Sequence, residues 1–245
     1  MEFNTAGDYL GSYFTTDRYV PHRMYPVDST SIAGAILDLQ MGEDQILFAI
    51  NFARFDSNST PSVLFNRREW EWPNPEMYTE FDMMHYTAAP NGVFYLTMDN
   101  TEYSVSIYSE SGELANSIYR SDAPRMQKTD EEIEEEIAIF EEHAVEDQAY
   151  TGGYQPCPYY QIISLTGVDE DGNLWIERLD TDQDAEGYMF DVWDSTGNLV
   201  YTASFREPEA DSEIYFHVDQ YGILAEVADP DLFPQVLYLE LQDQE

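Results

Sequence analysis

The chain has 245 residues and carries 49 acidic against 10 basic side chains, which gives a formal net charge of −39. This excess of negative charge excludes nucleic acids and anionic membrane surfaces as partners, because both require a basic face on the protein. A hydrophobic content of 43%, with 15% aromatic residues, predicts a folded, strand-rich protein and not a disordered acidic tail.

The first predicted elements are short strands. Residues 2–14 read as a strand, a turn and a second strand, and they match the corner between the third and fourth strands of units later in the chain. Residues 36–39, 45–52 and 62–66 are apolar-rich runs bounded by polar turn residues. They predict the first three strands of one repeating unit.

The segment after these strands holds the only local concentration of positive charge together with aromatic side chains. The candidate ligand-binding residues in it are Arg67, Arg68, Trp70 and Trp72. Arginine and tryptophan dominate binding hot spots, so this set is suited to a carboxylate, a sugar or a peptide. The alternative is a loop between units, in which the tryptophans pack and the arginines pair with the many surrounding acids.

A strand-hairpin pattern then recurs twice, in Asn91–Tyr119 and in Asp171–Phe205. In each copy an Asn-Gly or Asp-Gly turn opens an aromatic β run, and a second turn at Gly112 or Gly197 precedes the last strand. Recurrence of several short strands per unit is typical of radial or solenoid all-β architectures.

An insertion at residues 121–157 separates the two copies and contains a predicted helix at about 129–144. Thr129 with Glu132 forms the sequence pattern of a capping box. An apolar stripe at helical spacing consists of Ile133, Ile137, Phe140 and Ala144. The stripe indicates either a partner-binding or lid helix, or a helix that docks on the rim of a sheet with its acids solvated. We favour docking.

No catalytic residue, metal ligand or cofactor is predicted. Asp180, Asp182 and Asp184 alternate as in a calcium loop, but the glycine and the final glutamate of that loop are missing, which favours a solvated hairpin loop. The four histidines are scattered, and the single cysteine, Cys157, forms no internal disulfide. No nucleophile-elbow motif is present.

The C-terminal part predicts three strands, Glu213–Val218, Ile223–Val227 and Gln235–Leu241. Pairing of the last of these with Tyr9–Phe14 would close a ring and remove two exposed sheet edges.

Val168–Glu177, followed by Phe190–Val200, resembles a blade of the bacterial six-bladed β-propeller families related to NHL-repeat proteins. The resemblance implies an all-β propeller of four-stranded antiparallel blades as a single domain, 1–245. A blade takes about 40–45 residues, and only four to five units are recognisable here. The chain would then be either the C-terminal portion of a longer propeller, which we favour, or a smaller ring.

Propellers host many unrelated activities, so the fold alone does not fix the function. We expect a non-catalytic binding or interaction module that recognises a protein or carbohydrate ligand through its blade-loop faces. The alternative is a propeller enzyme of the metal-dependent lactonase or lyase type, with a central-channel site. A truncated propeller would also self-associate through its open blade edges.

The resemblance implies an extracytoplasmic location, although the first residues lack the basic and apolar segments of a signal peptide. No stretch approaches the ~20 apolar residues of a transmembrane helix, so no membrane insertion is expected. Lys128 is the only lysine among the basic residues. A lysine-poor, acid-rich surface fits a saline environment, or a surface that has simply drifted acidic.

Overall fold

The protein is all-β, with two helices in the part of the chain that the structure describes. The described residues of the computed structural model are 2–3, 9–11, 19–28, 30–42, 46–56, 61–147, 154–179, 187–205, 213–228 and 235–241.

The described strands form four sheets, and each meander follows the order of the chain. A small sheet pairs β1 (Glu2–Phe3) with β2 (Tyr9–Gly11). The next sheet has the order β3 (Tyr19–Pro26), β4 (Ser31–Met41), β5 (Ile46–Asp56) and β6 (Pro61–Trp72). A third sheet contains β7 (His85–Ala88), β8 (Phe94–Thr97), β9 (Ser104–Tyr108) and β10 (Leu114–Tyr119).

The fourth sheet is a curled sheet of seven strands with the order β14-β13-β12-β11-β15-β16-β17. Its first meander is β11 (Ile163–Val168), β12 (Leu174–Arg178), β13 (Tyr188–Trp193) and β14 (Leu199–Phe205). Its second meander is β15 (Glu213–Asp219), β16 (Gly222–Ala228) and β17 (Gln235–Leu239). The two meanders join through one parallel bridge, Gly167 with Val218.

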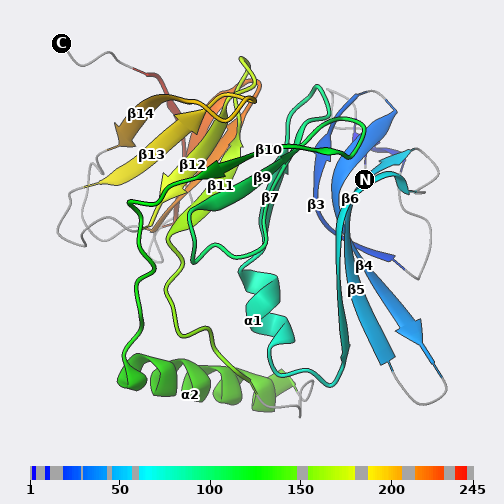
Figure 1. The fold of residues 1–245 in the computed structure, drawn as a ribbon, viewed down its shortest axis with the longest axis vertical. Coiled ribbons are helices and arrows are strands. Elements are labelled where there is room, and N and C mark those ends of the chain that lie inside the picture. Colours follow the sequence, from blue (N-terminus) through cyan, green and yellow to red (C-terminus); the bar gives the residue numbers. More distant parts are fainter. Residues whose placement is uncertain are drawn as a thin grey trace.

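The first strands of the meanders lie next to one another in chain order. β7 contacts β3 and β4 and also contacts β11, and β11 contacts β15. In Figure 1 the sheet of β7–β10 accordingly lies between the long strands β3–β6 and the seven-stranded sheet. We call β3, β7, β11 and β15 the inner strands.

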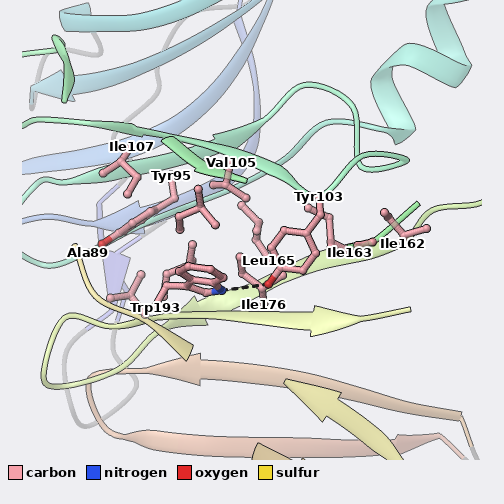
Figure 2. Packing of buried hydrophobic residues seen from close by; sticks show 14 residues of the cluster. Ala89, Tyr95, Tyr103, Val105, Ile107, Ile162, Ile163, Leu165, Ile176 and Trp193 are labelled. Atoms are coloured by element: carbon pink, nitrogen blue, oxygen red, sulfur yellow. Dashed lines mark hydrogen bonds between the residues drawn. The ribbon is translucent and has the colours of Figure 1, made fainter. Parts of the chain in front are cut away.

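The hydrophobic core consists of layers between consecutive meanders. One layer joins β3–β6 to β7–β10, with Phe65 and Phe94 stacked at a ring-centroid distance of 4.4 Å. A second joins β7–β10 to β11–β13, and Figure 2 shows its side chains interleaved. There the Trp193 indole donates a 3.0 Å hydrogen bond to the Tyr103 hydroxyl. Burying apolar area between successive sheets is what holds the meanders together.

The predicted turns are confirmed. Gly92, Gly112, Gly172 and Gly197 all have φ between +80° and +87°, where a side chain is strained and glycine is favoured. The two hairpin copies therefore form because short local turns fix their register.

The assignment of 36–39 as a first strand was wrong. These residues lie within β4, which is the second strand of its sheet because β3 precedes it. The predicted pairing of Tyr9–Phe14 with the C-terminal strand was also wrong. β2 pairs with β1, and β17 is an edge strand that pairs with β16, while residues 12–14 lie outside the described part of the chain.

The predicted helix is found as α2, Asp130–Asp147, with its capping box formed. The Thr129 hydroxyl accepts from the Glu132 amide at 3.3 Å, and Glu132 accepts from the Thr129 amide at 2.7 Å. The docking surface differs from the sheet rim that was expected. Phe140 packs on Tyr154 and on Tyr78 of α1 (Met77–Asp82), a short helix that the sequence did not predict.

Candidate functional site

A cavity of about 500 Å³ lies where the inner strands meet. Residues from β3, β7, β11 and β15 line it, and Glu177 of β12 and the turn after β15 complete the wall. Much of the lining is apolar or aromatic and includes Ala88, Val168 and Phe216. This combination of a concave apolar wall and a few polar groups is typical of small-ligand sites. We call it the inner cavity.

A β-bulge places Arg23 at the wall of the inner cavity. His22 pairs with Ala35 and Met24 pairs with Gly34, so Arg23 is the extra residue of β3. Bulges of this kind re-aim a side chain relative to its strand. Gly34 accommodates the bulge, because a Cβ there would lie 2.3 Å from the Arg23 carbonyl oxygen.

The groups around Arg23 are neutral. The Tyr25 hydroxyl donates to the Tyr86 carbonyl at 3.0 Å, and the Tyr86 hydroxyl donates to the Arg23 carbonyl at 3.2 Å. Burial raises the pKa of both tyrosines, while burial and then the nearby Arg23 charge lower the pKa of His85 to about 4. At neutral pH none of these side chains therefore offsets the guanidinium charge.

Arg23 also lacks a carboxylate partner among the described residues. Other cations of the chain do have one, and these are Arg67, Arg68, Arg120, Arg125 and Lys128. Arg23 is exposed and lies at the cavity wall without a carboxylate partner among the described residues, so its guanidinium can donate hydrogen bonds to an anionic group.

Glu177 is the acidic counterpart on another wall of the inner cavity. It lies opposite Ser164 in the β11–β12 ladder, and burial alone raises its pKa to about 7. Arg23 is not among the causes of this shift, so the shift gives no sign of an ion pair between Arg23 and Glu177. Asp219 is a further acid of the inner-cavity lining.

Ser164 and His85 form a contact that resembles part of a hydrolytic triad. The Ser164 hydroxyl lies 3.3 Å from His85 Nδ1. His85 also hydrogen-bonds to the backbone carbonyl of Asp82, where a triad would have a carboxylate. With its pKa lowered to about 4, His85 is a weak general base, so the contact favours structure over catalysis.

The four residues predicted from sequence do not line the inner cavity. Arg67, Arg68, Trp70 and Trp72 all lie on β6, which corrects the loop location given in the alternative interpretation of this set. Arg68 donates two 2.8 Å hydrogen bonds to the Glu80 carboxylate, and the Trp70 indole donates a third to the same group.

The two remaining members of that set also have partners within the chain. Arg67 donates to Asn51 at 2.7 Å and pairs with Glu69, and Trp72 packs against Phe48 at 5.4 Å. Trp70 is buried. The set is therefore held by internal contacts between β5, β6 and α1.

The remaining sequence features are the acidic run 180–184, the single cysteine, and the metal-ligating and membrane-spanning patterns. Asp180–Asp184 lies outside the described residues. Cys157 is a half-buried free thiol. Within the described ranges, no group of three or more His, Cys, Asp and Glu side chains is arranged to hold a metal ion, and no helix is long and apolar enough to cross a membrane.

Sequence reasoning missed Arg23, Tyr25 and Glu177 as site residues. One signal was available, because Arg23 is among only 10 basic residues and lies in an otherwise uncharged run, Tyr19–Val27. The bulge in β3 and the packing of β11 against β7 depend on contacts between residues far apart in sequence. A local sequence pattern does not reveal such contacts.

Comparison with known proteins adds little. No family model and no curated protein matches the chain. Among solved structures, one described as KlHsv2 with loop 6CD replaced by a Gly-Ser linker aligns with a TM-score of 0.39 and 6% identity, covering 90% of this chain and 70% of that one.

Proposed function

We propose that this chain is a non-catalytic ligand-binding module, built as part of a β-propeller and related to the six-bladed, NHL-like families. In this proposal the four meanders are blades whose first strands face a common axis. The order of contacts from β3 to β7, β11 and β15 supports it.

The observation that carries the proposal is the inner cavity. Its volume, about 500 Å³, falls in the range of small-ligand sites. Its lining combines aromatic and aliphatic side chains with Arg23, Glu177 and hydroxyl groups, which suits a carbohydrate or a short protein segment. Tyr215 and Tyr221, which are 53% and 78% exposed, add aromatic surface for such ligands.

The test is a screen of oligosaccharides and short peptides against the methyl-labelled protein by NMR. We expect ligands to shift the methyl signals of Ala88, Val168 and Val218 in the inner cavity. Val63 and Leu64, which precede the sequence-predicted set on β6, should not respond.

Ala88→Phe adds bulk at the inner-cavity wall and should abolish the shifts of the Val168 and Val218 methyl signals. Ala115→Phe adds the same bulk at an exposed position on β10 and serves as its control. Shifts confined to β6, or shifts that survive Ala88→Phe, would contradict the proposal.

A further inference from the structure

We propose that the inner cavity binds ligands that carry a carboxylate, and that Arg23 holds the carboxylate. This inference rests on the proposed binding function and specifies the chemistry of its ligand. It is argued from the placement of Arg23, from its surroundings and from the charge of the whole chain.

The backbone of β3 brings Arg23 to the inner cavity. The bulge in β3 and the bare backbone of Gly34 opposite it place the Arg23 side chain at the inner-cavity wall. Tyr25 lies within hydrogen-bonding reach of the Arg23 side chain. A planar guanidinium in this position presents a fork of donors that matches a carboxylate.

The side chains near Arg23 carry no charge that would offset its guanidinium. Tyr25, Tyr86 and His85, the groups that respond electrostatically to Arg23, are uncharged at neutral pH. No carboxylate among the described residues pairs with Arg23, although other cations of this acidic chain are paired in that way. Within the described ranges nothing offsets the Arg23 charge, so a ligand anion would find a positive charge available for pairing.

The acidic surroundings of the inner cavity favour a carboxylate ligand over a phosphate. The inner cavity also contains Glu177 and Asp219, and the chain has a net charge of −39. A single Arg compensates one negative charge, whereas a phosphate monoester carries ~1.5–2 at neutral pH and would leave part of that charge facing the acids. The apolar wall at Val168, Phe216 and Val218 suits the uncharged remainder of an organic acid.

The experiment compares two acids with their uncharged amides: phenylacetate with phenylacetamide, and glucuronate with glucuronamide. Affinities are measured by NMR titration of the methyl groups that line the inner cavity. Phenyl phosphate serves as the phosphate probe. The aromatic and sugar pairs distinguish which kind of acid the site prefers.

We expect at least one acid to bind about tenfold or more tightly than its amide, because a hydrogen bond to a charged group contributes that much. Arg23→Gln should reduce the affinity for the acid to that for the amide. Arg54→Gln, which removes the same charge from β5 outside the inner-cavity lining, should leave the preference intact.

Equal binding of acid and amide within the inner cavity would overturn the carboxylate inference and leave the binding function standing. Equal losses of affinity for the acid in Arg23→Gln and Arg54→Gln would also overturn it. So would phenyl phosphate binding more tightly than the carboxylic acids. The carboxylate inference would also be overturned if the inner-cavity methyl groups responded to none of the acids. The binding function itself is decided separately, by the peptide and oligosaccharide screen. The acid–amide comparison on the unmodified protein remains decisive if Arg23→Gln does not fold.

Discussion

Gly167 is where two meanders of the seven-stranded sheet meet. A Cβ at this position would lie 1.8 Å from the Val218 carbonyl oxygen, and that oxygen belongs to backbone that cannot rotate away. We expect Gly167→Ala to separate β11 from β15 and to lower the free energy of unfolding by about 3 kcal/mol. Urea denaturation measures this change.

Gly172→Ala is the matched control, because a Cβ there meets nothing within 4 Å and only the positive φ of +82° opposes it. Its cost should be about 1 kcal/mol. Equal losses in the two variants would show that the junction at Gly167 contributes no more than an ordinary turn.

Glu177 should make folding stability depend on pH. Its pKa is about 7 in the folded protein, against a reference value of 4.5, so the unfolded chain releases this proton first as the pH rises. The folded state is therefore favoured by the protonated Glu177 carboxyl, fully below about pH 4.5. This contribution to the free energy of unfolding is lost as the pH rises to about 7, and the loss amounts to roughly 3 kcal/mol at most.

Glu177→Gln should therefore be more stable than the unmodified protein above neutral pH and should flatten the pH profile between these limits. Thermal unfolding across pH measures the effect. The exposed Glu113→Gln is the control and should follow the unmodified profile. A Glu177→Gln profile that parallels the unmodified one would contradict this account.

Single residues were the hardest features to infer from sequence. Arg67 and Arg68 were singled out because they are adjacent, and the structure shows them paired with acids and Asn51 around β6. Arg23 has no charged neighbour in sequence, and its position depends on a bulge opposite Gly34. Local composition shows where charge is concentrated, but only the tertiary structure shows which charge lacks a partner.

At the scale of elements, α2 docks through an aromatic cluster, and hydrogen bonds from Tyr154 and Tyr160 to Glu136 and Glu132 add to it. The Phe140 ring stacks on Tyr154 at 4.1 Å and meets Tyr78 at 5.8 Å. We expect Phe140→Ala to loosen the helix and to accelerate amide hydrogen exchange across α2. Ile139→Ala removes a side chain that is 51% exposed and should change exchange little. Comparable exchange in the two variants would mean that the cluster does not hold the helix.

Hairpins and helix ends that are encoded by residues close together in sequence were predicted, whereas β3 and α1 were missed. The hairpins at Gly112 and Gly197 and the capping box of α2 depend on residues within a few positions of each other. β3 was missed because Pro21, Pro26 and the bulge interrupt its alternation. The six-residue helix α1 is too short to show helical periodicity.

At the scale of the whole molecule, one edge of the seven-stranded sheet presents exposed apolar side chains. β17 is an edge strand of the seven-stranded sheet, with Val236 and Tyr238 65% and 62% exposed. Exposed apolar edge strands favour pairing between chains. We expect reversible self-association in sedimentation experiments, weakened by Val236→Glu but not by Ile139→Glu on α2. Association that is equally strong in both variants would place the contact elsewhere.

The net charge of −39 should make stability depend on salt. Screening reduces self-repulsion, so the melting temperature should rise between low salt and about 1 M KCl. Because KCl is a weak salting-out agent, the rise would reflect screening more than exclusion from the surface. A melting temperature that is flat or falls with KCl would contradict this expectation and would favour an acidic surface without saline adaptation.

The all-β class was predictable from the sequence, but the way the chain closes was not. The all-β class depends on the alternation and turns present in each strand. Closure depends on which edge strands meet, and β2 and β17 each pair with a neighbour in sequence. The inner cavity likewise arises from strands of four separate meanders, so no single segment contains its signal.

The central claim is that the inner cavity is a carboxylate-binding site with Arg23 as its anchor. A crystal structure of the protein soaked in phenylacetate tests it most directly. We predict the acid inside the inner cavity, with its carboxylate within hydrogen-bonding distance of the Arg23 guanidinium and its ring against Phe216. An inner cavity without the acid, or an acid bound there with its carboxylate turned away from Arg23, would contradict the claim.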